Sequence, residues 1–366
     1  MKYCTACLMP ETRPRIAFDA HGVCNACQWA HEKKTAIDWD ARWQELKALC
    51  DRFRSPDGFD CIIPVSGGKD SSYVAYMMKH KLGMHPLCVT IRPDLALAIG
   101  EENVVRFINS GYDHLHLTPD PNVSRAINKR GLLEAGRPLL GWMTTVQTAI
   151  FKLAVLHRIP LIMFGEDGET EYGGTSKLKH KHYYDAEDSV KIYLEGHNPT
   201  TYRDQFSEKE LYWFRYPAAD AMRSVGLTVS HWSYFENWDP YQHYLVAKEH
   251  CGLREHSERS QGTYNNFAQT DTMLYNLHTY LMYLKFGFGR CTQDVGIDIR
   301  RGAMTRKQGL ALVKAFDRED PSQYVPPYLE YFGMGRDEFD ATIDKHVNKK
   351  LFEKRNGVWT PTFEVH

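Results

Sequence analysis

A glycine loop between an expected strand and an expected helix is the feature of this sequence that most constrains its fold. The loop reads Val65-Ser66-Gly67-Gly68-Lys69-Asp70-Ser71-Ser72. It follows an apolar run at 59–65 and leads into an apolar-periodic segment at 73–78. Two adjacent glycines let backbone N–H groups turn toward one point, and the following helix adds the positive end of its dipole. The sequence therefore predicts a loop that binds a phosphate chain.

This loop differs from the Walker phosphate loop. No glycine stands five positions before Gly68, and Asp70 occupies the place of the Ser or Thr that binds magnesium in a Walker loop. The order Ser-Gly-Gly-Lys-Asp-Ser resembles instead the PP-loop, the pyrophosphate-binding loop of enzymes that split ATP between its α and β phosphates. A glycine-rich turn without a ligand is the alternative. The pattern favours adenylylation.

Strands and helices alternate after the loop. The apolar pattern predicts strands at 61–65, 86–91, 114–117 and 160–164. It predicts helices at 71–81, 101–109, 121–134 and 142–157. Such alternation is typical of an α/β fold with a doubly wound parallel sheet, in which ligands bind beyond the carboxyl ends of the strands.

Two of these strand ends carry candidate binding residues. Val89 and Thr90 lie near the end of the second strand, where adenine could pack against the strand backbone. Gly165 and Glu166 follow the fourth strand, together with Asp167. Glycine permits close approach there, and the carboxylates could hold magnesium or a polar substrate. A solvated acidic turn is the alternative for the two carboxylates.

Four of the nine cysteines form two C-x-x-C pairs, which are Cys4 with Cys7 and Cys24 with Cys27. Their spacing predicts a zinc ribbon over residues 1–35, in which four thiolates complete a closed structural tetrahedron. Disulfide-bonded hairpins are the alternative, which a reducing compartment disfavours. The other five cysteines are scattered and are interpreted as small buried hydrophobic residues.

Length and charge bound the organisation of the chain. With 366 residues the chain exceeds the usual size of one core, so we expect three units: the ribbon at 1–35, an ATP domain at 36–175, and a substrate-binding insertion with a helical C-terminal region at 176–366. A net charge of −1 gives no overall field that would attract nucleic acid or a membrane. No apolar run has the length of a membrane span, and no secretory signal is recognisable, so we expect a cytoplasmic protein.

The second half of the chain is less regular. Helices are expected at 38–54, 240–249, 263–284 and 305–316, with possible capping boxes at Ser207 and Thr305. A basic run at 177–182 beside tyrosines could meet a diphosphate, although a solvated face is the commoner explanation. The cations Lys285, Arg290, Arg300 and Arg301 could stabilise departing pyrophosphate, with surface charge at helix ends as the alternative.

Taken together, six motifs resemble the N-acetyl sugar amidotransferase family, and the resemblance runs nearly from end to end of the chain. The motifs are Tyr3-Cys4-Thr5-Ala6-Cys7-Leu8-Met9-Pro10, Gly22-Val23-Cys24-Asn25-Ala26-Cys27, Ile63-Pro64-Val65 with the loop up to Ser72, Pro86-Leu87-Cys88-Val89-Thr90, Gly165-Glu166 with Glu171-Tyr172-Gly173-Gly174, and Lys285-Phe286-Gly287-Phe288-Gly289-Arg290. The family belongs to the PP-loop ATP pyrophosphatases, which have the adenine nucleotide alpha hydrolase-like fold. It is similar to the synthetase half of glutamine-dependent amidotransferases and acts on acetamido sugars of bacterial surface polysaccharides, such as lipopolysaccharide O-antigen, or of flagellar glycans.

The resemblance implies an AMP-forming carbon–nitrogen ligase. It would adenylylate the acetamido oxygen of an N-acetyl sugar, expected to be UDP-linked, and let ammonia replace it to give an acetamidino sugar, with ATP, Mg²⁺ and structural Zn²⁺ as cofactors. The residues expected to bind ATP are Ser66, Gly67, Gly68, Lys69, Asp70, Ser71, Ser72, Val89, Thr90, Gly165 and Glu166. The expected catalytic residues are Lys69, Asp70, Lys285 and Arg290. The expected substrate-binding residues are Glu171, Tyr172, Gly173, Gly174 and Lys177.

Ammonia is expected to come from another protein, because no cysteine of this chain sits in a G-x-C-x-G elbow or directly follows Met1. The resemblance implies a separate glutaminase subunit and a barrel partner like the pair used in histidine biosynthesis, with no nucleic-acid partner and no membrane insertion. Two alternatives stay open. One is a tRNA-thiolating PP-loop enzyme, and the other is a non-catalytic zinc-ribbon adaptor.

Overall fold

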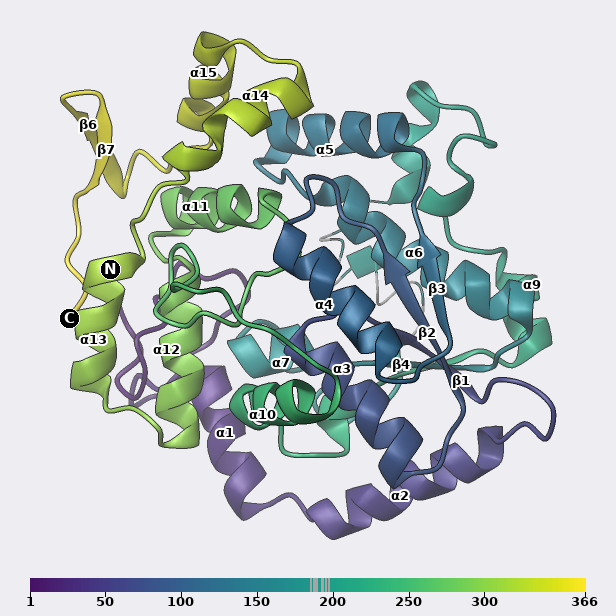
Figure 1. The fold of residues 1–366 in the computed structure, drawn as a ribbon. Coiled ribbons are helices and arrows are strands. Elements are labelled where there is room, and N and C mark those ends of the chain that lie inside the picture. The colour runs from purple at the N-terminus through teal and green to yellow at the C-terminus, as the bar shows by residue number, and fades with distance from the viewer. Residues whose placement is uncertain (185, 187–189, 192–193, 195, 197) are drawn as a thin grey trace.

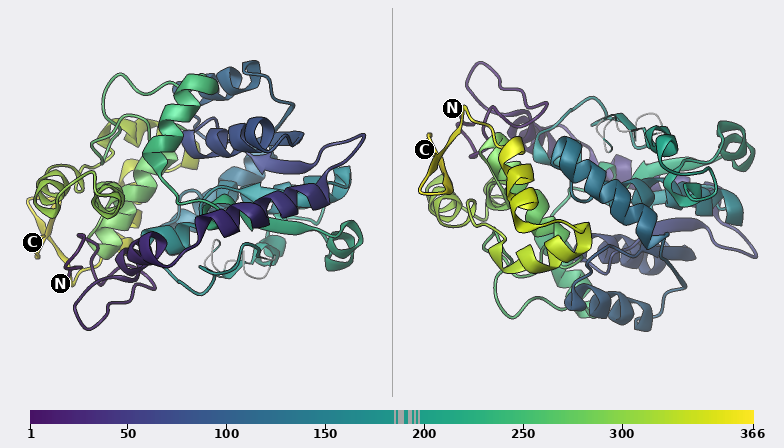
Figure 2. Two further views of the ribbon diagram at one scale, coloured as in Figure 1. Left: turned by 90° about the horizontal axis from the view of Figure 1, so that it is seen from below. Right: turned by 90° about the horizontal axis from the view of Figure 1, so that it is seen from above.

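The computed structural model describes residues 1–366 except 185, 187–189, 192–193, 195 and 197. A central sheet has helices on both faces, and the C-terminal helices gather beside it (Figure 1). The two termini lie close together in every view (Figure 2). The ring centroids of Tyr3 and His366 are 5.2 Å apart. The chain thus begins and ends next to the same group of C-terminal helices.

Five parallel strands form the sheet in the order β3-β2-β1-β4-β5. They are β1 (Cys61–Pro64), β2 (Pro86–Ile91), β3 (His114–Leu117), β4 (Leu161–Phe164) and β5 (Thr228–His231). The first four confirm the strands expected from the sequence. The short β5 was not expected, and it extends the sheet beyond residue 175, where we expected the ATP domain to end. Strand order reverses between β1 and β4, and a reversal of this kind is where open α/β sheets bind ligands.

The two faces of the sheet are covered by different helices. Ile63 packs with α2 (Trp39–Phe53) and α3 (Lys69–Tyr76), whereas its neighbour Ile62 packs with α6 (Leu140–His157) on the opposite face. A π-helical turn, Met77–Lys81, continues α3. The helices that complete this part are α4 (Ala98–Asn109) and α5 (Pro121–Ala135). Coverage of both faces confirms the doubly wound arrangement.

Helices dominate the remainder of the chain. They are α7 (Gly168–Tyr172), α9 (Ala219–Val225), α10 (Pro240–His250), α11 (Leu274–Phe286), α12 (Arg290–Arg301), α13 (Arg306–Phe316), α14 (Val325–Phe332) and α15 (Arg336–His346), with 3₁₀ helices at Pro199–Asp204, Tyr212–Phe214, Trp232–Tyr234 and Ser322–Tyr324. An antiparallel hairpin, β6 (Phe352–Arg355) with β7 (Val358–Pro361), ends the chain. No helix among the described residues is long and apolar enough to cross a membrane.

Two expectations about this region need correction, and one is confirmed. The helix expected at 263–284 begins only at Leu274, so residues 263–273 form a loop. Ser207 and Glu210 do exchange hydrogen bonds, but only the 3₁₀ turn Tyr212–Phe214 follows them. The capping box at Thr305 is present at the start of α13.

The N-terminal residues form a small module around the cysteines. Isolated bridges pair Tyr3 with Pro10 and Phe18 with Cys24, and α1 (Asn25–Thr35) begins directly after Cys24, so that Cys27 lies in its first turn. We call residues 1–35 the cysteine module. Its core contains the four paired cysteines, and Phe288 from the C-terminal region packs against them.

Candidate active site

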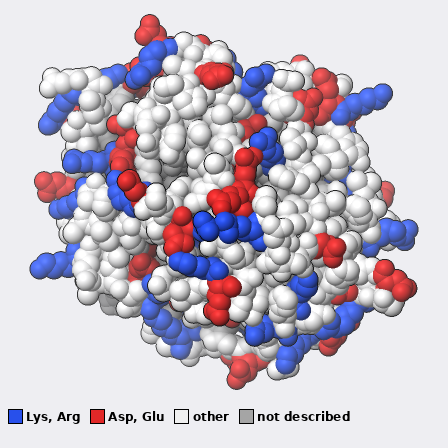
Figure 3. Space-filling view, viewed as in Figure 1, with Lys and Arg blue, Asp and Glu red and all other residues white. Residues whose placement is uncertain are grey.

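A cavity of about 240 Å³ opens at the reversal of strand order, where β1 and β4 end. We call it the ATP cavity. Its lining residues are Ser66, Gly68, Lys69, Asp70, Ser71, Gly165, Glu166, Tyr172, Phe267, Ala268, Gln269, Thr270, Asp271, Tyr275 and Arg290. Three segments far apart in the sequence therefore meet here: the loop after β1, the turn after β4 and the C-terminal region. On the face shown in Figure 3, positive and negative side chains are interspersed.

The glycine loop lies against α4, and this contact explains one of its glycines. Gly67 has a φ of +77°, and a Cβ there would come within 2.7 Å of the backbone nitrogen of Val104. Gly68 begins α3 as its N-cap residue, and its N–H points to the hydroxyl of Ser66 at 3.3 Å. A larger residue at Gly67 would therefore push the loop off α4, whereas a Cβ at Gly68 would meet only the hydroxyl of Ser66, at 3.2 Å. The start of α3 is thereby aimed into the cavity.

Asp70 is held from two sides. Lys69 Nζ lies 2.5 Å from one carboxylate oxygen, and His243 Nδ1 lies 2.9 Å from the other. His243 is 1% exposed and stacks on Tyr73 at 4.1 Å. Burial raises the pKa of Asp70, but the charge of Lys69 and the hydrogen bond with His243 outweigh burial and bring the pKa down to about 2. His243 comes from α10, and sequence reasoning missed it because nothing in its local pattern marks it.

Two further carboxylates face the cavity. Burial and then repulsion by Asp70 raise the pKa of Glu166 to about 7. Burial also raises the pKa of Asp271, whose Oδ1 is buried without a hydrogen-bond partner among the described residues. Carboxylate oxygens without partners are the ligands that a hard cation such as Mg²⁺ takes. Because both oxygens of Asp70 already have partners, Glu166 and Asp271 fit a cation better than Asp70 does.

Arg290 is fixed by the way α12 begins. The backbone N–H groups of Gly289 and Thr292 donate to the carboxylate of Asp317 at 2.7 and 2.9 Å, which caps the helix. Arg290 Nε lies 2.9 Å from Asp294 Oδ1. Burial lowers the pKa of Arg290, but the charge of Asp294 outweighs it, so the pKa is raised overall and the guanidinium keeps its charge. A buried, oriented guanidinium is suited to a phosphate.

Gln269 is the least expected residue of the cavity. Its φ is +57°, and both polar atoms of its side-chain amide are buried without a partner among the described residues. It was not expected from the sequence, because the apolar pattern predicted a helix over residues 263–273. Backbone strain and unpaired buried groups of this kind concentrate at functional sites.

Several residues expected in the site lie elsewhere. Val89 and Thr90 are buried in the sheet, and the hydroxyl of Thr90 donates to the carbonyl of Val65 at 2.6 Å. Gly67 and Ser72 support the loop but do not line the cavity. Lys285 lines a different cavity, and its ammonium donates to the carbonyl of Ala135 at 2.8 Å.

The expected substrate segment mostly faces the cysteine module. Of its residues only Tyr172 lines the ATP cavity. Glu171 is buried and accepts hydrogen bonds from Trp29 Nε1 at 3.0 Å and from Lys33 Nζ at 2.7 Å. Gly173 and Gly174 pack against Ala26 and Glu169, and Lys177 is exposed. Glu171 thus serves as an attachment point for α1.

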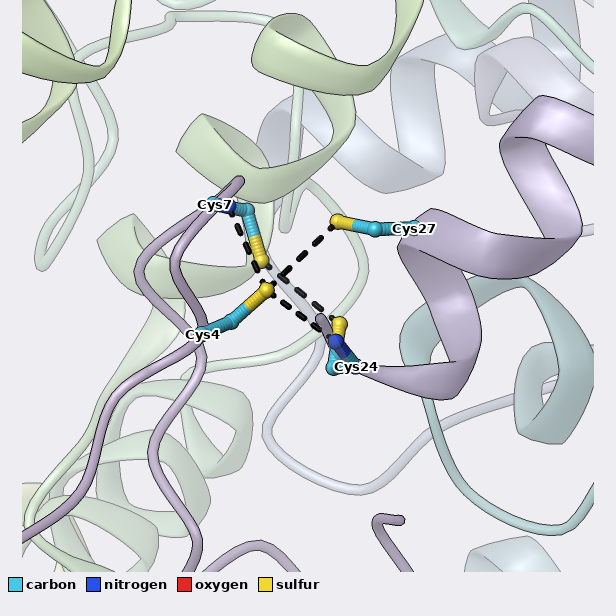
Figure 4. A group of neighbouring side chains, drawn as sticks. All are labelled: Cys4, Cys7, Cys24 and Cys27. Atoms are coloured by element: carbon cyan, nitrogen blue, oxygen red, sulfur yellow. Dashed lines mark hydrogen bonds between the residues drawn. The ribbon is translucent and has the colours of Figure 1, made fainter. Parts of the chain in front are cut away.

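The four paired cysteines point toward one another (Figure 4). Their sulfur atoms all lie within 4.8 Å of each other, with 3.7 Å between Cys7 and Cys24 and 3.9 Å between Cys4 and Cys27. A tetrahedral Zn²⁺ with Zn–S bonds of about 2.3 Å places its sulfurs about 3.8 Å apart. Hydrogen bonds from the neighbouring thiols and the Cys7 backbone lower the pKa of Cys4. The cluster therefore fits a metal ion. The remaining cysteines are buried, as expected.

The sheet order and the Ser-Gly-Gly-Lys-Asp-Ser loop at its switch point define a PP-loop α/β protein. Residues 261–364 match the family described as "LPS biosynthesis protein WbpG-like, C-terminal domain". The match covers this C-terminal segment alone, which we call the WbpG-like domain after the family it resembles, and the segment supplies Gln269, Asp271 and Arg290 to the ATP cavity.

Other comparisons are more distant. The chain is similar to the U34-tRNA thiolase NcsA from Methanococcus maripaludis, a structure that contains its 4Fe-4S cluster. The identity is 11%, the match covers 72% of this chain and 79% of that chain, and the TM-score is 0.33. So distant a likeness assigns no function to this chain. Among curated proteins, none matches this sequence.

Proposed function

We propose that this chain is the synthetase subunit of an ATP-dependent amidotransferase that turns the acetamido group of a sugar into an acetamidino group, in the biosynthesis of lipopolysaccharide O-antigen or a related glycan. The observation that carries the proposal is the ATP cavity itself. Its phosphate-binding loop faces residues supplied by a WbpG-like domain. A loop that directs cleavage of ATP is thereby joined to a domain from a family of glycan-forming proteins.

The proposed reaction has two steps. The oxygen of the acetamide attacks the α-phosphorus of ATP, the bond to pyrophosphate breaks, and an O-adenylyl imidate forms. Ammonia then adds to the imidate carbon, and AMP leaves with the former amide oxygen. Activation is needed because an amide oxygen is a poor leaving group. Neither step requires a covalent nucleophile from the protein, so positioning and charge stabilisation are what the site has to provide.

The residues of the cavity suit these tasks. Lys69 and the N–H groups at the start of α3 would bind the phosphates, and Arg290 would stabilise departing pyrophosphate. Glu166 and Asp271 would hold Mg²⁺, which neutralises phosphate charge when bound. Zn²⁺ in the cysteine cluster would be structural, because four thiolates leave no open position.

The cysteines help to decide between this proposal and thiolation of tRNA. A thiolating enzyme needs a cysteine or a cluster that handles sulfur next to ATP. No described residue that lines the ATP cavity is a cysteine. Cys61, Cys88 and Cys251 are buried in the core, and burial raises the pKa of each thiol. A buried, protonated thiol is a poor nucleophile. Release of ammonia from glutamine by a glutaminase of the cysteine type also needs a nucleophilic thiol. We therefore propose that a separate glutaminase, with a barrel partner, supplies the ammonia.

The direct test supplies ammonia as a salt. The purified chain is incubated with ATP, Mg²⁺, ammonium chloride and a panel of UDP-diacetamido sugars, and products are followed by mass spectrometry. We expect AMP, pyrophosphate and a sugar product that is lighter by the difference between O and NH. Glutamine alone should not replace ammonium. Absence of ammonium-dependent AMP release with every sugar would refute the proposal and favour the adaptor alternative.

A further inference from the structure

A second cavity, of about 370 Å³, adjoins the ATP cavity at Gln269, which lines both. We call it the amide cavity, because four carboxamides line it. They are Gln261, Gln269, Asn276 and Gln323. Tyr324 adds a ring and a hydroxyl to the wall. The volume is of the order that a sugar ring with its substituents requires.

The described lining of the amide cavity has no net positive charge, because Arg259 stands beside two carboxylates, Glu258 and Glu319. Arg259 forms a two-pronged ion pair with Glu319, with distances of 2.7 and 2.6 Å. Glu319 also accepts the N–H of Gly262 at 2.8 Å. Binding of a phosphate would call for cations that are not already paired with carboxylates. Amides and hydroxyls, which donate and accept, suit instead a ring rich in hydroxyl groups.

Gln269 is prepared for a ligand at the junction of the two cavities. It is 9% exposed, and a buried amide left without a partner is unfavourable. The backbone that follows Gln269 is fixed by two hydrogen bonds. Leu97 N–H donates to the carbonyl of Asp271 at 3.0 Å, and Met273 N–H donates to the carbonyl of Leu95 at 3.0 Å. A buried amide without a protein partner beside this fixed segment is available to a group that enters the cavity.

We propose that the amide cavity binds the sugar ring of the acceptor, and that Gln269 hydrogen-bonds its acetamido group where the two cavities meet. This inference rests on the proposed function. The four carboxamides and Tyr324 all belong to the WbpG-like domain, whereas the phosphate-binding loop lies outside it. Acceptor recognition would thus reside in the WbpG-like domain, and not in the segment 171–177 expected from the sequence.

Another cavity competes for this role. It has a volume of about 450 Å³ and is lined by Arg13, Lys285, Phe286 and Gln293, among others. It does not share a lining residue with the ATP cavity. A sugar bound there would therefore not border the phosphate-binding loop. Gln293 offers a matched control, because it carries the same amide into the competing cavity.

The test measures binding of the same UDP-diacetamido sugars by calorimetry to the full chain and to Asn276→Leu, Gln323→Leu, Gln269→Leu and Gln293→Leu. Loss of one hydrogen bond is expected to raise the dissociation constant about tenfold in each of the first three variants. Gln293→Leu should stay within about twofold of the wild type. ATP binding and thermal melting on the same samples show whether each variant is folded, and Gln323, which is exposed at the rim, is the least able to disturb the core.

The outcomes separate this inference from the proposed function. Loss of sugar binding in Gln293→Leu with normal binding in Asn276→Leu and Gln323→Leu would overturn the assignment of the amide cavity as the sugar site, even if AMP release were observed. Failure of the wild type to bind any sugar of the panel would overturn it as well. Binding that depends on Asn276 and Gln323 but leads to no ammonium-dependent AMP release would support the site and refute the proposed chemistry.

Discussion

Glu166 and Glu171 lie close together in the chain, but they serve two regions with opposite demands. Glu166 faces the ATP cavity beside the like charge of Asp70, and its pKa rises to about 7. Glu171 points into the cysteine module, where Lys33 and Trp29 donate to its two oxygens. One carboxylate is kept ready for a ligand or a proton, and the other holds two parts of the molecule together. Side chains that support the fold thus have partners within the protein, whereas side chains of the candidate site are left available to a ligand.

The two regions are joined by two helices. On α7, Glu171 contacts the cysteine module and the next residue, Tyr172, lines the ATP cavity. On α12, Arg290 reaches the cavity from the first turn, while Arg300 in the last turn donates to the carbonyl of Glu171 at 3.1 Å. The helices α1, α7 and α12 pack against one another (Figure 1). Damage to the module should therefore weaken ATP binding.

The largest effect is expected from Lys69→Met, which tests the cavity without touching the module. Loss of a buried cation that binds phosphate should lower the rate of ATP–pyrophosphate exchange roughly 100–1000-fold, measured with a sugar bound. The melting temperature should fall as well, because the carboxylate of Asp70 loses its cationic partner, so exchange is measured at a temperature at which the variant is folded. Lys177→Met, at an exposed position, is the control. Exchange at the wild-type rate would remove Lys69 from the proposed chemistry.

Removal of the metal should have the next largest effect. In Cys27→Ser the cluster loses one of four ligands, so bound zinc should fall below one ion per chain, and ATP should bind about tenfold more weakly as α7 and α12 lose their support. Zinc is measured by elemental analysis and ATP binding by calorimetry. Cys50→Ala, a buried cysteine outside the cluster, should keep its zinc. Loss of zinc with unchanged ATP affinity would show that the two regions are independent.

Much of the fold could be predicted because the strands of a parallel sheet and the helices between them have recognisable apolar patterns in the sequence. Buried strands on both sides of the phosphate-binding loop are short continuous apolar runs, and α5 and α6 are long and periodic. The strand β5 escaped because it follows an irregular segment and its sequence, Thr-Val-Ser-His, contains only one apolar residue. Residues 263–273 escaped because their apolar side chains, such as Phe267, suggested that α11 starts earlier. Periodicity does not reveal where a loop replaces the first turns of a helix.

The residues of the candidate site also fall into those that could be predicted from the sequence and those that could not. The residues of the glycine loop could be named, because their spacing follows from what a phosphate requires of the backbone. His243, Gln269 and Asp271 could not, because each depends on which distant segment folds back onto the loop. Glu171 was expected to bind substrate because it belongs to the motif Glu171-Tyr172-Gly173-Gly174, which resembles that of the amidotransferase family. Only the position of Lys33 shows that it binds the cysteine module.

Lys33→Met tests the contact between the cysteine module and α7 with a smaller change than loss of a metal ligand. The ion pair of Lys33 with Glu171 is nearly inaccessible, with the two side chains 8% and 10% exposed. Its loss leaves a buried carboxylate without its cation and should lower the free energy of unfolding by about 3 kcal/mol, with ATP binding weakened several-fold. The double variant Lys33→Met with Glu171→Gln should recover part of both losses. Arg15→Met, which breaks a more exposed pair with Glu169, should cost less than about 1 kcal/mol.

The smallest effect expected is a pH-dependent difference between Glu166→Gln and Glu171→Gln. The pKa of Glu166 is raised from its ordinary value of 4.5 to about 7 in the folded protein, so the stability it contributes is complete below pH 4.5 and is lost as the pH rises through 7. Glutamine does not ionise, so it avoids the cost of a buried negative charge. The gain in stability of Glu166→Gln over the wild type should therefore grow by about 2 kcal/mol as the pH rises from 5 to 8. Glu171→Gln should be less stable than the wild type at pH 8, because it breaks the ion pair with Lys33.

Thermal melts of both variants and the wild type across this pH range measure the two effects together. The difference between each variant and the wild type removes the contribution of every other titrating group, including Asp317, whose buried carboxyl has a pKa of about 6. In Asp70→Asn the neighbouring negative charge is gone, so the gain from Glu166→Gln should shrink. If both glutamine variants shift stability in the same direction at pH 8, then Glu166 is held by partners as Glu171 is, and the contrast between cavity and module fails at the two residues that define it.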